Sequence, residues 1–385
     1  MKILVLGGTG AMGIHLVRFL EKQNNQVYVT SRSRSGINNN INYIQGNAHN
    51  QEFLNSLLSQ NWDVIVDFMV YSTPVFQQRY TQFLKSTKQY IFISSARVYA
   101  DSIQPITENS LRLLDTIKDS DYLKTDEYAL TKARQENLLF DSNSKNWTII
   151  RPYITYDDER LQLGVLEKED WLYRALHGRS IVTAKDIQAK VTTLTAGKDV
   201  ARGICALIGN ELALGEAFHI TTDQSISWRQ ISEIYLHALA KNGFKVNLVE
   251  QDLDNFLTWR KGKYQVIYDR LFNRVFNNEK ISQFIDTSTF ISPQIGLEAC
   301  IQNFLSSKPY AFKSINWQEE ALKDKALKES TCLSEISGFK TKIKYCLFKS
   351  LPKVGRLLTR WNSTQHQKKM HWLLSHYSKP IAFAM

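Results

Sequence analysis

The most informative segment of this chain is Ile3-Leu4-Val5-Leu6-Gly7-Gly8-Thr9-Gly10-Ala11-Met12-Gly13. Four apolar residues lead into a turn with the glycine spacing G-x-x-G-x-x-G, and an apolar-periodic helix follows to Lys22. Glycines let the backbone approach a ligand closely, and the free N–H groups at a helix start attract negative charge. A purely structural turn is the alternative, but a turn placed after the first strand favours a nucleotide. We therefore predict a dinucleotide site formed by Gly7, Thr9, Gly10, Ala11, Met12 and Gly13.

Short apolar segments alternate with helical segments over the first 150 residues. The strand-like segments after the first are 26–30, 64–68, 90–94 and 147–151, and helices are expected near 76–86 and 125–140. Strands that alternate with helices indicate βαβ units. We predict an α/β fold with a Rossmann-type, doubly wound parallel sheet, a smaller C-terminal substrate lobe and a basic helical extension.

The domain boundaries follow from changes in composition. Residues 1–160 are expected to form the Rossmann domain, to which residues 190–222 return. Residues 161–189 and 223–305 are expected to form the substrate-binding lobe, and residues 306–385 a basic helical extension.

The second strand ends without the acidic residue that an NAD site places on the ribose hydroxyls. The chain there has Ser31-Arg32-Ser33-Arg34. Arginine can accept a 2′-phosphate, so Ser31 and Arg32 favour NADP over NAD, with a solvated basic loop as the alternative. Asn47, between the segments 26–30 and 64–68, can hydrogen-bond the adenine.

A serine at a strand end and a Y-x-x-x-K pair on the next helix predict acid–base chemistry. The strand ends at Ser94-Ser95-Ala96-Arg97, and Tyr128 and Lys132 are spaced four residues apart. This spacing puts both side chains on one helical face, where an ammonium lowers the pKa of a phenol from about 10 toward neutrality. Ser95 can hydrogen-bond the same substrate oxygen, which allows proton removal together with hydride transfer to a nicotinamide.

Together these motifs resemble the extended short-chain dehydrogenase/reductase family, also called the NAD-dependent epimerase/dehydratase family, over residues 1–305. Two further segments are similar to the family's pattern, Arg151-Pro152-Tyr153-Ile154-Thr155-Tyr156 and Lys198-Asp199-Val200-Ala201. The resemblance implies that Ser95, Tyr128 and Lys132 are the catalytic triad, and that Phe68, Met69 and Tyr153 lie along the cofactor. It also implies a homodimer, since relatives commonly pair through the helix that carries Y-x-x-x-K.

Departures from the family pattern restrict the reaction. Ala96 and Arg97 follow Ser95 where sugar dehydratases usually carry an acidic pair, and no cysteine stands near that strand to act as a second base. Plain oxidation, reduction or C4 epimerisation remains. Lys190, Arg270 or Arg274 can replace the arginine that binds a diphosphate in enzymes acting on nucleotide sugars.

Three functions remain open at this stage. The first is an NAD(P)-dependent oxidoreductase or epimerase that acts on a sugar hydroxyl, most simply that of a nucleotide sugar, through a keto intermediate. An NADPH-dependent keto-sugar reductase uses the same residues. A non-catalytic RNA-binding relative of the fold is the third, and the retained Ser95, Tyr128 and Lys132 argue against it.

Composition and charge restrict the possible partners, the location and the metal content of the protein. The formal charge is +11, and residues 338–385 contain ten Lys or Arg and no Asp or Glu. This tail could contact an anionic membrane or partner, or pack on the body; nucleic acid is the least favoured partner. No stretch reaches the roughly 18 apolar residues of a membrane span, and no secretory signal opens the chain, so we expect a cytoplasmic location. Four scattered cysteines predict no metal site.

Overall fold

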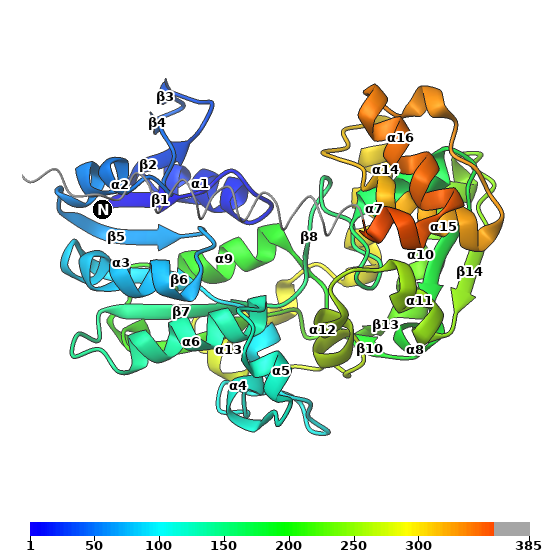
Figure 1. The fold of residues 1–385 in the computed structure, drawn as a ribbon. Helices are drawn as coiled ribbons and strands as arrows, with labels where there is room; N and C mark the ends of the chain where they lie inside the picture. The colour runs from blue at the N-terminus through cyan, green and yellow to red at the C-terminus, as the bar shows by residue number, and fades with distance from the viewer. Residues whose placement is uncertain (358–385) are drawn as a thin grey trace, which may run out of the picture.

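The chain forms an eight-stranded sheet at its centre, seen in the computed structural model, which describes residues 1–357 (Figure 1). The strand order is β12-β7-β6-β5-β1-β2-β4-β3, and every neighbouring pair is parallel except β3 with β4. The strands are β1 (Lys2–Leu6), β2 (Gln26–Ser31), β3 (Gly36–Asn38), β4 (Ile41–Gln45), β5 (Trp62–Asp67), β6 (Thr87–Ile93), β7 (Trp147–Pro152) and β12 (Glu216–Ile220).

Helices cover both faces of this sheet. Successive residues of a strand point to opposite faces, and those of β1 belong alternately to two separate cores. Ile3 and Val5 pack with α1 (Gly13–Lys22) and α9 (Gly197–Leu207), and Leu4 and Leu6 lie in the core formed with α2, α3 and α6. These last three helices are Gln51–Leu58, Thr73–Lys85 and Tyr128–Phe140. The predicted doubly wound α/β fold is confirmed.

The winding direction reverses at β1. The chain runs from β1 through β2 to β4 on one side, and then returns to β5 and continues through β6 and β7 to β12 on the other. In such sheets ligands bind beyond the carboxyl ends of the strands at this switch point. The glycine-rich turn after β1 lies at this position.

A smaller lobe, to the right in Figure 1, covers the carboxyl end of the sheet. Its core contains the buried aromatic residues Trp171, Trp228, Tyr235 and Trp259, among others. Its helices are α7 (Lys168–Leu176), α8 (Lys185–Gln188), α10 (Trp228–Lys241), α11 (Leu253–Trp259), α12 (Lys263–Gln265) and α14 (Pro293–Ser306). Its short strands form three two-stranded pairs, β9 (Ile181–Ala184) with β14 (Leu248–Gln251), β8 (Thr155–Tyr156) with β11 (Thr195–Ala196), and β10 (Val191–Thr192) with β13 (Ile226–Ser227).

Short helices link these elements. They are η1 (Ala96–Val98), α4 (Leu113–Thr116), α5 (Ser120–Leu123), η2 (Glu211–Ala213), η3 (Val266–Arg270), α13 (Glu279–Ser282), η4 (Thr287–Thr289) and, after Leu305, η5 (Leu333–Glu335).

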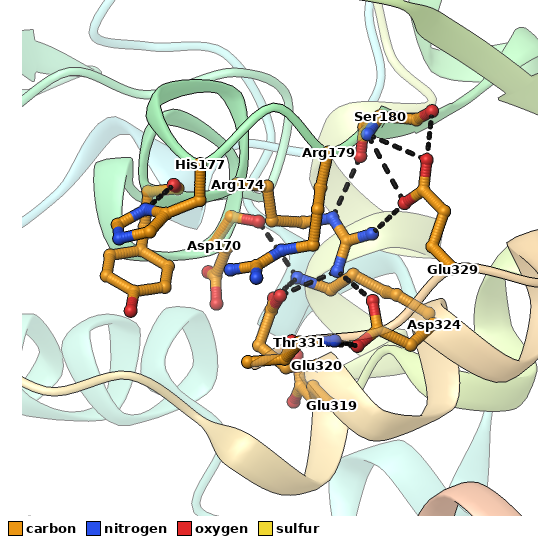
Figure 2. A network of polar contacts seen from close by, with 12 residues as sticks. Asp170, Arg174, His177, Arg179, Ser180, Glu319, Glu320, Asp324, Glu329 and Thr331 are labelled. Atoms are coloured by element: carbon orange, nitrogen blue, oxygen red, sulfur yellow. Dashed lines mark hydrogen bonds and ion pairs between the residues drawn. The ribbon is translucent and has the colours of Figure 1, made fainter. Parts of the chain in front are cut away.

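The segment after Leu305 packs on the lobe through buried ion pairs. It forms α15 (Trp317–Leu327) and α16 (Phe339–Ser350), which lie against each other over the lobe (Figure 1). Figure 2 shows Arg174 of α7 with Glu320 and Asp324 of α15. The fully buried Arg174 guanidinium donates to Glu320 Oε2 at 2.6 Å, to Asp324 Oδ1 at 2.9 Å and to Glu329 Oε2 at 2.7 Å.

Other cations of the lobe pair with carboxylates of the same segment. Arg179 donates to both Glu335 oxygens at 2.9 Å, and Arg260 donates to Glu319 at 3.0 Å. The first part of the extension therefore presents acidic residues inward, and its basic character begins only at Gly338. Among residues 1–357 no helix is long and apolar enough to cross a bilayer.

Candidate active site

The glycine-rich turn has the conformation of a phosphate cradle. Gly7 has φ +73°, and a Cβ on it would meet Met69 Sδ at 3.0 Å. A Cβ on Gly13 would lie 2.7 Å from the backbone of Gly8, so the helix start packs directly on the turn. A larger residue at Gly7 or Gly13 would therefore distort the turn.

The mouth of this turn is open. A Cβ on Gly10 would have no other atom within 4 Å. Thr9 and Gly10 are exposed, and Ala11 and Met12 are half-buried. In the first turn of α1 the Ile14 N–H donates to the Gly10 carbonyl at 3.0 Å, and the other first N–H groups of a helix have no intrahelical partner. These residues fit a pyrophosphate, which would take the open space beside Gly10.

At the end of β2, Ser31 and Arg32 differ in whether their side chains are free to bind a ligand. The nearly buried Ser31 Oγ accepts the N–H groups of Ser33 at 3.3 Å and Arg34 at 3.1 Å, so this side chain shapes the loop. Arg32 is exposed, and its guanidinium has no acceptor within residues 1–357. Asn47 is also exposed, and its Oδ1 accepts the His49 N–H at 3.1 Å, which leaves its amide nitrogen to meet a base.

A second cation lies beside this end. A cavity of about 220 Å³ opens between α1 and the β3–β4 hairpin and is lined by Thr9, Arg18 and Arg34, among others. Arg34 stacks over Tyr43 with 5.6 Å between Cζ and the ring centroid. The hairpin that forms this wall was not predicted.

Ser95, Tyr128 and Lys132 line one cavity of about 420 Å³ between the sheet edge and the lobe. The cavity extends to Met12 of the glycine turn and to Phe68 after β5, so it joins the glycine turn to Ser95, Tyr128 and Lys132. Its walls are Met12, Phe68, Val70, Ile93, Ser94, Ser95, Arg97, Tyr128, Lys132, Pro152, Tyr153, Ile154, Thr155, Arg160, Gln162, Glu167, Gln265 and Arg270.

Lys132 is held rigidly at the base of this cavity. Its side chain is buried, and Nζ donates to the Ile93 carbonyl at 2.7 Å and lies 5.9 Å from the Tyr128 ring centroid. Burial lowers the pKa of Lys132 from 10.5 to about 8, against the opposing charges of Asp67 and Glu136. A lysine with such a pKa can exchange a proton near neutral pH.

The environment of Tyr128 differs from the expectation. Burial raises the pKa of its phenol above 10, and the groups that oppose this rise are Arg97, Arg160 and the hydrogen bond with Ser95. The Arg97 guanidinium stands 5.3 Å from the ring centroid. The expectation that Lys132 lowers the pKa of the phenol toward 7 is thus wrong for the protein without a bound cofactor. Burial raises this pKa by more than the nearby cations lower it.

Arg97 is the residue that sequence reasoning left without a role. Its guanidinium donates to Glu127 at 2.5 Å and lies 3.5 Å from Asp269, which places it beside Tyr128. The only signal in the sequence was its position two residues after Ser95. There it was interpreted only as the absence of the acidic residue that sugar dehydratases carry.

Two further arginines enter the cavity from the lobe side. Arg160 donates to Thr155 Oγ1 at 2.9 Å, and the buried Arg270 donates to the Gly164 carbonyl at 2.9 Å and contacts Asp269. Arg270 is therefore the one of the three predicted diphosphate cations that lines the cavity, since neither Lys190 nor Arg274 does. Arg274 instead donates to backbone carbonyls of Tyr99 and Ala100.

Of the remaining predicted residues, some line the cavity and others pack behind it. Phe68 lines the cavity, whereas Met69 packs against Gly7 from behind. Tyr153 lines it as well, but its hydroxyl donates to Asp269 at 3.2 Å, away from the dinucleotide turn. Arg151 of the R-P-x-x-x-Y segment binds both Glu136 oxygens at 2.8 and 2.9 Å and so fixes α6 against β7.

Asp67 is a further buried group that the sequence did not single out. It ends β5, with Oδ1 accepting the Met69 N–H at 2.9 Å and Oδ2 accepting the Tyr90 hydroxyl at 2.8 Å. Burial raises its pKa from 3.8 to about 6. Its charge in turn raises the pKa of Lys132.

We expect Asp67→Asn to change how stability depends on pH. Because the folded pKa lies above the unfolded value, the wild type loses stability as pH rises from 3.8 through about 6, by about 3 kcal/mol in all. The variant cannot ionise at this position, so between pH 4 and pH 7 its free energy of unfolding in urea should gain about 2.5 kcal/mol relative to the wild type. A constant difference would contradict this.

Asp63→Asn, on the same strand, is the control for this experiment. The pKa of Asp63 is lowered, chiefly by its hydrogen bond with Lys88. A lowered pKa stabilises the fold above the unfolded pKa, so this variant should lose stability relative to the wild type as pH rises, by a small amount because the pair is exposed.

Comparisons with solved structures show the same fold. An epimerase from Methanothermobacter thermautotrophicus has a TM-score of 0.63 at 16% identity, covering 79% of this chain and 92% of that protein. UDP-glucuronic acid 4-epimerase from Bacillus cereus, in complex with UDP-glucuronic acid and NAD, has a TM-score of 0.60 at 19% identity, covering 80% of this chain and all of that protein. At these identities the likeness concerns the fold alone.

Among curated proteins, the chloroplast stem-loop binding protein of 41 kDa b from Arabidopsis thaliana is 27% identical over 259 residues. The match covers 63% of this chain and 63% of that protein, so the chain spans less than two thirds of the relative's length.

The sequence model of the NAD dependent epimerase/dehydratase family matches residues 3–220, which is more than half of the chain. This stretch contains the glycine turn, Ser95, Tyr128 and Lys132. The resemblance inferred from the motifs is confirmed, and the chain belongs to the NAD dependent epimerase/dehydratase family.

Proposed function

We propose that this protein is an NAD(P)-dependent oxidoreductase or epimerase that acts on a sugar hydroxyl, most simply that of a nucleotide sugar. One observation carries the proposal: Ser95, Tyr128 and Lys132 line a single cavity that continues to the glycine turn. A nicotinamide cofactor, when bound, supplies the hydride acceptor. The structural neighbour bound to UDP-glucuronic acid and NAD supports the substrate class.

The side chains divide the proton chemistry between them. The Ser95 hydroxyl holds the substrate oxygen, and the Tyr128 phenolate takes the hydroxyl proton as the carbon loses hydride. A phenol with a raised pKa needs added positive charge to ionise, and Arg97 and Arg160 are the cations that lower the pKa of Tyr128. Lys132, whose pKa is about 8, can pass the proton onward.

The walls suit a polar, anionic substrate. Arg160 and Arg270 line the lobe side of the cavity, where they can bind a diphosphate. Gln162 is nearly buried there, and its Oε1 has no partner within residues 1–357, so it can accept a hydrogen bond from a sugar hydroxyl.

Cofactor turnover separates an epimerase from a keto-sugar reductase. The purified protein is incubated with UDP-glucose, UDP-glucuronic acid and their 4-keto derivatives. An epimerase converts the sugar without net consumption of added NADPH, whereas a reductase consumes one NADPH per product. Absence of both, with every substrate, would count against the enzymatic proposal.

Arg32 is expected to select NADP. Its exposed guanidinium at the end of β2 can pair with the 2′-phosphate. We expect Arg32→Asp to weaken NADPH binding by roughly 10–100-fold, since a charge-assisted hydrogen bond contributes about 1.5–3 kcal/mol, and to weaken NADH binding less. Titration of nicotinamide fluorescence measures both affinities.

Lys118→Asp, at an exposed lysine before α5, makes the same change in net charge as the Arg32 variant and is its control. If Arg32→Asp changed the two affinities equally, or if Lys118→Asp reproduced its effect, the NADP preference would need another source.

RNA binding is the second candidate, and the stem-loop binding relative favours it. The two functions make different demands on Tyr128, since RNA retention needs no phenol at the base of a cavity. RNA retention that persists in a protein inactive on every sugar tested would favour this candidate.

A further inference from the structure

The outer face of α16 exposes apolar side chains that the fold leaves uncovered. Phe339 and Ile343 are 77% and 51% exposed, and Leu347 is half-buried on the same side. Tyr345 and Phe348, on the opposite side, are buried against α15. The helix therefore has two apolar sides, and only the inner one is used within residues 1–357.

Lysines border the exposed stripe on both sides. With about 3.6 residues per turn, Lys340 and Lys344 lie along one edge of the Phe339–Ile343–Leu347 stripe, and Lys342 and Lys349 lie along the other. Apart from Lys349, which contacts Ser330, these lysines have no hydrogen-bond or ion-pair partner in the described chain. Long lysine side chains at such borders carry their charge toward an adjoining polar layer.

The pattern continues past the helix. Residues 352–357 are helical, and Leu351, Val354 and Leu357 are 57%, 42% and 64% exposed. From residue 338 to 357 the chain has six Lys or Arg and no Asp or Glu. A surface this apolar and this cationic is complementary to an anionic layer with hydrocarbon beneath it.

Buried hydrogen bonds hold the inner side of α16 against α15. The Tyr345 hydroxyl donates to Asp324 Oδ2 at 2.6 Å and accepts the Thr331 N–H at 3.0 Å. Asp324 also binds Arg174 of the lobe, in the network that Figure 2 shows. These buried contacts fix the inner side of α16, so the outer side faces away from the lobe.

We propose that the surface made by Phe339, Ile343, Leu347, Leu351, Val354 and Leu357 with its bordering lysines docks on a bilayer that contains anionic phospholipid. The apolar side chains enter the headgroup–acyl boundary, and the lysines contact the lipid phosphates. An RNA partner fits less well, because four of the six apolar residues are leucine or isoleucine, one is valine and only one is aromatic, whereas RNA binding uses aromatic stacking. This inference is independent of the proposed catalytic function.

The test is co-sedimentation of the full chain with vesicles. One set is phosphatidylcholine alone, and the other contains one third phosphatidylglycerol. We expect retention on the anionic set only, falling at high salt. Ile343→Ser combined with Phe339→Ser should reduce the partition coefficient at least tenfold, and Lys340→Gln combined with Lys344→Gln by about the same factor.

Matched controls change equivalent residues elsewhere. Ile103→Ser alters a fully exposed isoleucine, and Lys118→Gln with Lys124→Gln removes two exposed lysines of another surface. These variants should bind vesicles like the wild type.

Three results would overturn the proposal. They are no retention on anionic vesicles, retention that the α16 variants leave unchanged, and retention of a mixed-sequence RNA in place of vesicles. A fourth result would show that residues 358–385 cover this face instead. In that case Phe339→Ser and Ile343→Ser would lower the thermal midpoint of the full chain, and the wild type would not bind vesicles, which also overturns the proposal.

Discussion

Tyr128→Phe is expected to lower kcat by roughly 10²–10⁴-fold, the range for loss of a positioned acid–base group. The ring stays in place over Arg97 and the cavity keeps its shape, so only the phenolic proton is lost. Dinucleotide affinity should change less than threefold, because the phosphate cradle lies at the other end of the cavity. Steady-state kinetics with the active sugar, together with a fluorescence titration of the dinucleotide, measure both quantities.

Tyr80→Phe is the control for this variant. Tyr80 lies half-buried on α3 and lines no part of the cavity. It should leave kcat unchanged. A Tyr128→Phe enzyme with wild-type turnover would remove the basis of the proposed function and strengthen the RNA-binding candidate.

Arg174→Met is expected to destabilise the protein by about 3–5 kcal/mol, the cost of breaking a buried ion pair by removing one partner. Arg174 is fully buried and binds three carboxylates, of which those of Glu320 and Asp324 are also buried. Without the guanidinium these charges have fewer partners in the lobe. Urea unfolding measures the loss, and adding Glu320→Gln should restore part of it.

The matched control is Arg229→Met, which breaks an exposed pair. Arg229 and Glu250 are 54% and 24% exposed, and such pairs contribute about 0–1 kcal/mol. If Arg174→Met cost no more than this control, the buried network would not hold the extension on the lobe.

Local pattern was sufficient to predict the fold and the cavity's central residues. The glycine turn after β1 and the four-residue spacing of Tyr128 and Lys132 are short-range features, and their conformations follow from backbone geometry. The hairpin of β3 and β4 had a local signal too, since Asn39 and Asn40 adopt φ of 48° and 61°, which asparagine tolerates well. The run of asparagines at 38–40 is therefore a turn signal, although no turn was predicted there.

The rest of the site depends on contacts between distant segments. Arg97 acquires its place from Glu127 and Asp269, and no short motif relates these three residues. The raised pKa of Tyr128 comes from burial beneath the lobe, which composition does not reveal. Net charge likewise gave no indication of the carboxylates on α15, because paired charges cancel in the total.

The pairing of Arg174 with α15 also determines when the lobe can mature during synthesis. A ribosome adds Glu320 146 residues after Arg174, which at about 5–20 residues per second is a delay of roughly 7–30 s. Until then the nascent lobe carries an arginine with no counter-charge to accompany it into the interior. This half of the protein can therefore complete its buried ion pairs only late in synthesis, once α15 has been made.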